Sequence, residues 1–167
     1  MCTPWSVSLH TLDASSIIHA WDHYPLYQFP GLWNWLAREA QARRLCIAIV
    51  ALDEVVHKYP DCAAWLKRQN IRRLPMINEV VQAAMNIKDE VGIQNDQYHP
   101  TGVGENDILI IAVAQYHSAA LITNEARQFG KQKQAAKLRI PAVCDLPSVQ
   151  VSHLNFVEYI KQSKQIF

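Results

Sequence analysis

The chain has 167 residues, a length that suits one domain with its own buried core. Half of the residues are hydrophobic and only 19% are charged, which excludes an intrinsically disordered chain. The formal net charge of +1 excludes a protein that binds nucleic acid through its overall charge, so any polyanion site has to be a local patch.

The first part of the chain alternates short apolar runs with amphipathic stretches. Apolar runs of a few residues predict strands, and apolar residues three or four apart predict helices. The expected elements are a strand at 7–12, a short helix capped by Ser15 or Ser16, a helix at 30–44, a strand at 45–48 and a helix at 50–58.

The rest of the chain continues this alternation. The expected elements are helices at 61–69 and 75–91, a polar loop at 92–105, an almost wholly apolar helix capped by Asn106, a strand at 119–123, a helical stretch at 131–138, a strand at 140–144 and a closing helix at 152–164. The apolar helix must be buried on most sides. Strands that alternate with helices indicate an α/β fold with a parallel sheet flanked by helices, and the absence of repeats or linkers indicates a single domain over 1–167.

The four cysteines, at positions 2, 46, 62 and 144, include no Cys-x-x-Cys pair, so they predict neither a zinc site nor a disulfide framework. Cys46 and Cys144 lie in apolar runs and are interpreted as buried free thiols, which indicates a reducing compartment. The N-terminus does not resemble a signal peptide, and the longest apolar run, at 108–114, is too short to span a bilayer. We therefore expect a cytoplasmic protein with no membrane partner.

Four acids occupy positions that a parallel sheet would bring to one edge. Asp13 and Glu125 directly follow the first and third expected strands, and Asp107 opens the buried helix. Glu54 lies in the helix after the second strand, although its neighbour Asp53 competes for the inward position. Ligands of open parallel sheets bind at the carboxyl ends of the strands, and right-handed crossovers place these turns on one edge, so the acids are expected to converge there.

Such a convergence requires a counter-charge. Two carboxylates about 4 Å apart repel each other by roughly 4 kcal/mol at an effective dielectric constant near 20. The cluster must therefore bind protons or a divalent cation. Oxygen donors without His or Cys favour Mg²⁺ or Mn²⁺ over zinc, and such ions can activate water for attack on a phosphodiester.

The segments LDASSIIHAW, NDILIIAVA and LITNE follow one another in an order and spacing that resemble the PIN domain, above all the VapC-type toxin ribonucleases of toxin–antitoxin pairs. The resemblance covers about residues 6–145 and leaves 146–167 as a C-terminal helical extension. It implies a three-layer PIN-like α/β fold with a short, mostly parallel central sheet. It also implies a Mg²⁺- or Mn²⁺-dependent endoribonuclease and an antitoxin protein that covers the acidic pocket.

Carried over residue by residue, the resemblance implies four catalytic, metal-binding acids: Asp13, Glu54, Asp107 and Glu125. The family more often has Asp at the last position, so Glu125 binds the metal either directly or through water. Four polar residues near the acids either cap helices and turns or contact the metal ligands and substrate: Ser15, Asn106, Thr123 and Asn124.

Several interpretations stay open at this point. The chain could be a catalytically inactive PIN-like binding scaffold, or a nuclease specific for DNA or for a nucleic-acid structure. A homodimer is one of the oligomeric states that the sequence leaves open. His19 and His23 are four residues apart, as a metal-binding pair would be, but the nearby loop makes this interpretation weak. The basic residues are either solvated charges or a rim that holds a phosphate backbone: Lys67, Arg68, Arg72, Arg73, Lys131, Lys133 and Lys137.

Overall fold

Five short parallel strands form the central sheet of the protein, which a computed structural model describes over residues 8–167. The strands are β1 (His10–Leu12), β2 (Leu45–Ala48), β3 (Arg72–Leu74), β4 (Ala120–Ile122) and β5 (His153–Leu154). Their spatial order is β3-β2-β1-β4-β5, and every neighbouring pair is parallel. The α/β fold with a parallel sheet is therefore confirmed. Cys2, and Val7 at the start of the first expected strand, lie outside the described residues.

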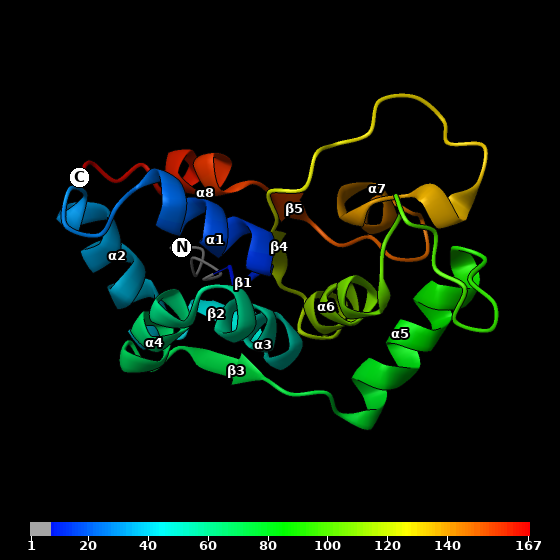
Figure 1. The fold of residues 1–167 in the computed structure, drawn as a ribbon, viewed down its shortest axis with the longest axis horizontal. Coiled ribbons are helices and arrows are strands. Elements are labelled where there is room, and N and C mark those ends of the chain that lie inside the picture. Colours follow the sequence, from blue (N-terminus) through cyan, green and yellow to red (C-terminus); the bar gives the residue numbers. More distant parts are fainter. Residues whose placement is uncertain (1–7) are drawn as a thin grey trace, which may run out of the picture.

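Eight α-helices flank this sheet in the described part of the chain. They are α1 (Ala14–His23), α2 (Pro30–Gln41), α3 (Ile49–Lys58), α4 (Pro60–Arg68), α5 (Asn78–Glu90), α6 (Glu105–Tyr116), α7 (Ile140–Cys144) and α8 (Phe156–Ser163). Figure 1 shows α5 outside α6, against which it packs, at the opposite end of the molecule from α2.

The core lies where the central strands meet α6. Leu12 of β1 is in register with Ile47 of β2 and Ile122 of β4, and all three side chains are fully buried. Ile110 and Ile111 of α6 are also fully buried, which confirms that this helix has hardly any polar face to expose to solvent. β1 and its two neighbours are therefore a rigid base for the residues that follow their carboxyl ends.

Two predicted elements are wrong. The segment Ile140–Cys144 is helix α7 and not a strand, because Pro141 in its first turn lacks the N–H that a strand needs and suits the start of a helix. The expected helix at 131–138 is reduced to a single 3₁₀ turn, Ala135–Lys137. This leaves a long irregular segment between β4 and α7.

Two strands at the sheet edges were not predicted. β3 carries two exposed arginines, Arg72 and Arg73, and only Leu74 of this strand is buried, so it lacks the apolar run of an inner strand. β5 has two residues and occupies the start of the expected closing helix. That helix instead begins at Phe156, after Asn155, whose side chain accepts a hydrogen bond of 2.8 Å from the Glu158 N–H.

The helices that begin near the acids are capped differently from the prediction. Asp13, rather than Ser15 or Ser16, occupies the N-cap position of α1. Helix α6 begins at Glu105 after Gly104, so Asn106 lies inside its first turn. The carboxylate of Asp107 reaches back and accepts a hydrogen bond of 2.7 Å from the Gly104 N–H, which is why the helix starts before Asn106.

Cys46, Cys62 and Cys144 are buried and free, which confirms the interpretation of Cys46 and Cys144 as buried thiols. Within residues 8–167, none of the helices combines the length and hydrophobicity that crossing a bilayer requires.

Candidate active site

The carboxyl ends of β1 and β4 form the centre of the candidate site. The chain builds the sheet in one direction from β1 to β3 and in the other through β4 and β5, so the strand order reverses between β1 and β4. Such a reversal opens a crevice at the carboxyl ends of the two strands. Asp13 follows β1 at this point, and its N–H donates a hydrogen bond of 2.9 Å to the Ile122 carbonyl of β4.

A network of hydrogen bonds fixes the Asp13 carboxylate. Its Oδ2 accepts hydrogen bonds from Ser15 Oγ at 2.5 Å and from Thr123 Oγ1 at 2.9 Å. Each hydroxyl oxygen in turn accepts a backbone N–H, from Asn124 to Ser15 at 3.0 Å and from Glu125 to Thr123 at 3.3 Å. The start of α1 and the end of β4 are therefore joined through this carboxylate.

Asp13 is an unusual carboxylate because it is only 3% exposed. Burial raises its pKa to about 6 from the ordinary value of 3.8, since a low dielectric disfavours the charged form. The hydrogen bonds from Ser15 and Thr123 oppose this rise, and the negative charges of Asp107 and Glu54 add to it. Asp13 thus requires a positive partner to remain ionised at low cost.

Asp107 and Glu125 are in the same electrostatic environment. Burial raises the pKa of Asp107, the Gly104 N–H lowers it, and the charge of Glu54 raises it further. Burial also raises the pKa of Glu125, and the charges of Asp107 and Asp13 act in the same direction. Glu125 Oε2 accepts a hydrogen bond of 3.1 Å from the Ile140 N–H, which opposes the rise in the pKa of Glu125. The charge of at least one other acid therefore raises the pKa of each of Asp13, Asp107 and Glu125.

The structure favours Glu54 over Asp53 as the remaining acid. Glu54 is half-buried and its charge acts on both Asp13 and Asp107, whereas Asp53 is exposed and does not contribute to either pKa. Glu54 forms an ion pair of 2.6 Å with Lys58, one helical turn further along α3. Both acids line a pocket of about 420 Å³ together with Val50, His57, Lys58 and Asn106.

The polar residues around the acids have distinct positions. Ser15 and Thr123 contact Asp13 directly, as described above. Asn124 Oδ1 accepts a hydrogen bond of 2.9 Å from the Phe156 N–H, so this side chain satisfies the first turn of α8. Asn106 lies on the wall of the pocket beside Glu54.

Two cations of the site were not predicted. Lys58 pairs with Glu54, and the charge of Arg139 lowers the pKa of Glu125. The spacing of four residues between Glu54 and Lys58 is the usual helical spacing of an ion pair and was the available signal. Arg139 carried no such signal, because it lies 14 residues beyond Glu125 and comes near only through the fold.

The donor chemistry of these residues suits a hard cation. Four carboxylates are the oxygen ligands that Mg²⁺ and Mn²⁺ prefer. Burial is the main cause of the raised pKa values of Asp13, Asp107 and Glu125, and the charges of neighbouring acids add to it. A bound cation would offset both effects. In residues 8–167, however, no three His, Cys, Asp or Glu side chains are already arranged to hold a metal. His19 and His23, whose spacing was only a weak indication of a metal site, stack ring on ring at 4.0 Å, and burial lowers the pKa of His19.

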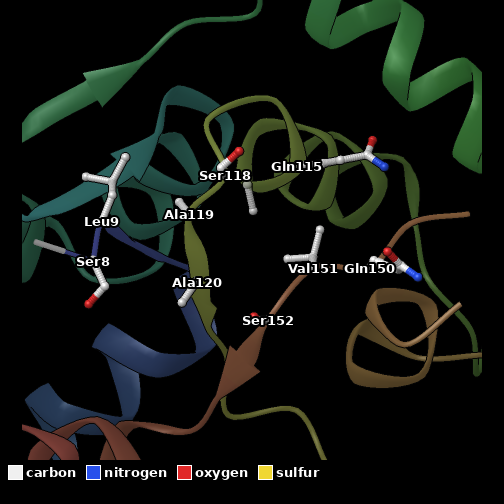
Figure 2. Close-up of a pocket in the computed structure, with 10 residues that line it drawn as sticks. Ser8, Leu9, Gln115, Ser118, Ala119, Ala120, Gln150, Val151 and Ser152 are labelled. Carbon is white, nitrogen blue, oxygen red and sulfur yellow. The ribbon is translucent and has the colours of Figure 1, made fainter. Parts of the chain in front are cut away.

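A different pocket lies at the opposite, amino-terminal end of β4 (Figure 2). The described residues that line it are small, amide-bearing or aliphatic, and none of them is charged. Leu9, just before β1, and Ala120 of β4 line one side of it, and Gln115 of α6 and Gln150 lie on the flanking segments. Because none of these residues has a group that could perform acid–base or metal chemistry, this pocket is not a candidate active site.

Comparisons with known proteins agree with this architecture. A family model described as "Domain of unknown function (DUF4411)" matches residues 10–167. Among solved structures, VapBC2 from Rickettsia felis, bound to a DNA fragment from their promoter, aligns with a TM-score of 0.56 and 16% identity over 88% of this chain and 98% of that chain. PAE2754 from Pyrobaculum aerophilum aligns with a TM-score of 0.54 and 12% identity over 95% and 92%. A search of curated proteins finds no match. The PIN-like fold expected from the sequence is confirmed.

Proposed function

This chain belongs to the DUF4411 family, and we propose that it is a Mg²⁺- or Mn²⁺-dependent endoribonuclease that hydrolyses RNA phosphodiester bonds. The environment of Asp13 carries the proposal. This carboxylate is buried at the reversal of the strand order, and two further acids raise its pKa. A buried carboxylate under such repulsion is costly unless a cation binds beside it.

The four acids would hold the ion: Asp13, Glu54, Asp107 and Glu125. Bound there, it would lower the pKa of a water molecule and neutralise charge on the phosphate. Ser15 and Thr123 hold the Asp13 carboxylate in one orientation by donating to the same oxygen. Lys58 and Asn106, which line the pocket beside Glu54, would contact a phosphate oxygen. Water adds to phosphorus, the P–O bond breaks, and the leaving oxygen takes up a proton.

The second part of the proposal concerns the biological role. We propose that the protein is the toxin of a toxin–antitoxin pair and acts in the cytoplasm, with an antitoxin protein that covers the acidic pocket. The resemblance of the three sequence segments to VapC-type toxins supports this role, and so does the likeness of the fold to VapBC2. Inspection of the neighbouring gene for a small partner, followed by co-purification, tests it.

Digestion of single-stranded RNA with Mn²⁺, and with EDTA in its place, tests the reaction. We expect cleavage only with the metal, and we expect Glu54→Gln to lower the rate about 100-fold or more. Glu79→Gln is the matched control, because it makes the same change at an exposed glutamate of α5, outside the pocket that Glu54 lines, and should leave the rate unchanged. Cleavage that survives EDTA would contradict metal dependence, and equal cleavage of single-stranded DNA would contradict specificity for RNA.

Ser15→Ala tests how the Asp13 carboxylate is supported. The variant loses one donor to Oδ2, so the pKa of Asp13 should rise further and Mn²⁺ should bind about 10- to 100-fold more weakly. Ser16→Ala is the control, because Ser16 Oγ donates to the Asp13 backbone carbonyl at 2.7 Å and not to its carboxylate. Calorimetric titration with MnCl₂ measures the Mn²⁺ dissociation constant of each variant. Equal dissociation constants for the two variants would show that Ser15 has no such role.

A further inference from the structure

The segment that follows Glu125 has a charge unlike that of the rest of the chain. Residues 126–144 contain five basic residues and no acid, a formal charge of +5, whereas the whole chain has +1. The remaining residues therefore carry −4. The five basic residues are Arg127, Lys131, Lys133, Lys137 and Arg139. In Figure 1 the same segment, drawn in yellow, leaves β4 and makes a wide outward detour before α7.

The side chain of Gln128 closes the base of this detour. Its Nε2 donates a hydrogen bond of 3.0 Å to the Lys137 carbonyl, and its Oε1 accepts one of 2.8 Å from the Arg139 N–H. Residues 129–138 thus lie between Gln128 and Arg139, and we call them the clasped loop. Gly130 has a φ of +88°, which permits a turn directly after Phe129.

The returning end of the clasped loop is packed against the body of the protein. The Val103 N–H donates a hydrogen bond of 2.9 Å to the Leu138 carbonyl. A Cβ on Gly102 would lie 1.9 Å from the Ala136 carbonyl oxygen, so only glycine allows this approach. The loop therefore projects from an anchored base.

The tip of the clasped loop presents an aromatic ring and two ammonium groups to solvent. Phe129 is 93% exposed, and Lys131 and Lys133 are exposed as well. Among residues 8–167, neither lysine forms an ion pair, whereas Arg127 is paired with Glu158 at 3.0 Å. Exposing a whole phenyl ring has a free-energy cost in water, which stacking on a flat ligand would remove.

The clasped loop is joined to the acidic centre at its base. Glu125 precedes the segment, and its carboxylate accepts the hydrogen bond from the Ile140 N–H, just after the clasp. The charge of Arg139 also acts on Glu125. A polyanion bound along the loop would therefore extend toward the acids. The acids are negatively charged and cannot attract a polyanion themselves, so the basic loop would supply that attraction.

We propose that the clasped loop is the binding surface for single-stranded RNA, with Phe129 stacked on a base and Lys131 and Lys133 paired with phosphates. This assignment rests on the proposed function, because RNA is its substrate. Stacking on an exposed ring together with nearby cations is the usual mode of binding single strands. A duplex hides the faces of its bases from such a ring, so the loop should discriminate against it.

Fluorescence anisotropy with a labelled 12-nucleotide RNA in EDTA measures binding without cleavage. Phe129→Ala should weaken binding about 5- to 150-fold, the effect expected for one lost base stack, while Phe129→Trp should retain it. Tyr27→Ala is the matched control, because Tyr27 is an 89% exposed aromatic residue on the distant α1–α2 connection. Unchanged affinity in Phe129→Ala, or equal affinity of the protein for duplex RNA, would overturn the assignment.

Salt dependence tests the two lysines. In the double variant Lys131→Ala/Lys133→Ala, the slope of log Kd against log salt should fall by about 1.4, or about 0.7 for each lost phosphate contact. Lys161→Ala, which removes an exposed charge from α8, is the control and should leave the slope unchanged. If the slope changed equally in the double variant and in Lys161→Ala, that result would contradict the assignment. If RNA binding does not depend on the loop but metal-dependent cleavage is observed, only the assignment of the loop as the RNA-binding surface is refuted. If binding depends on the loop but no cleavage is observed, only the proposed reaction is refuted.

Discussion

Asp13→Asn should lower metal-dependent RNA cleavage at least about 1,000-fold while the protein stays folded. The amide has nearly the shape of the carboxylate, and its oxygen can still accept the hydrogen bonds from Ser15 and Thr123. It lacks the negative charge that a divalent cation requires at this buried position. The loss should therefore appear in the reaction and in Mn²⁺ binding, but not in the secondary structure.

The measurement compares cleavage rates, Mn²⁺ titrations and circular dichroism spectra of the wild type and the variant. Asp22→Asn is the matched control, because Asp22 lies in the same helix, α1, and accepts a hydrogen bond of 3.0 Å from the Tyr59 hydroxyl. It should retain full activity. An Asp13→Asn protein that cleaves RNA at the wild-type rate would show that this carboxylate is not part of the reaction centre.

The places of Asp13 and Asp107 in the fold were predictable because each adjoins an element with a strong apolar pattern. Asp13 directly follows the fully buried strand β1, and Asp107 lies in the first turn of α6, whose apolar sequence is typical of a core helix. Parallel strands then bring their carboxyl ends to one edge of the sheet without further information. The sequence could not separate Asp53 from Glu54, because the apolar pattern of α3 fits both, and only the packed helix reveals which side is covered.

The errors fall where tertiary contacts outweigh the local pattern. Ile140–Cys144 is apolar enough for a strand, but Pro141 and the position after the long loop make it a helix. Residues 131–138 have good helix formers, yet the Gln128 side chain and the approach of Gly102 hold the backbone in an open loop. Both features depend on residues that are distant in sequence or on one side chain, and neither produces a periodic signal.

The proposed metal site consists of buried acids that are not already closed around a cation. Burial raises the pKa of Asp13, Asp107 and Glu125, and the charge of at least one other acid adds to each rise, whereas Glu54 forms an ion pair with Lys58 in the pocket wall. Binding of a divalent ion at Glu54 must compete with that ion pair. An exposed pair of this kind is weak, so the competition is not prohibitive.

The metal-free protein should lose unfolding free energy as the pH rises from about 4 to about 7. Burial raises the pKa of Asp13 to about 6 in the folded state, against 3.8 when it is solvated. Between these values the folded state binds more protons than the unfolded state, so stability falls with rising pH. A difference of about two units corresponds to a loss of roughly 3 kcal/mol, complete once the pH exceeds the folded pKa. The raised pKa values of Asp107 and Glu125 act in the same direction.

Urea denaturation in EDTA, at several pH values, measures this loss, and Asp13→Asn isolates the contribution of one group. Burial lowers the pKa of His10, which acts in the opposite direction in both proteins and cancels in the comparison. The variant should therefore be more stable than the wild type above pH 6 and lose that advantage near pH 4. Mn²⁺ should restore the stability of the wild type alone, because it supplies the charge that the buried carboxylate lacks. Parallel stability profiles for the two proteins would mean that Asp13 is ionised at no cost and needs no cation beside it.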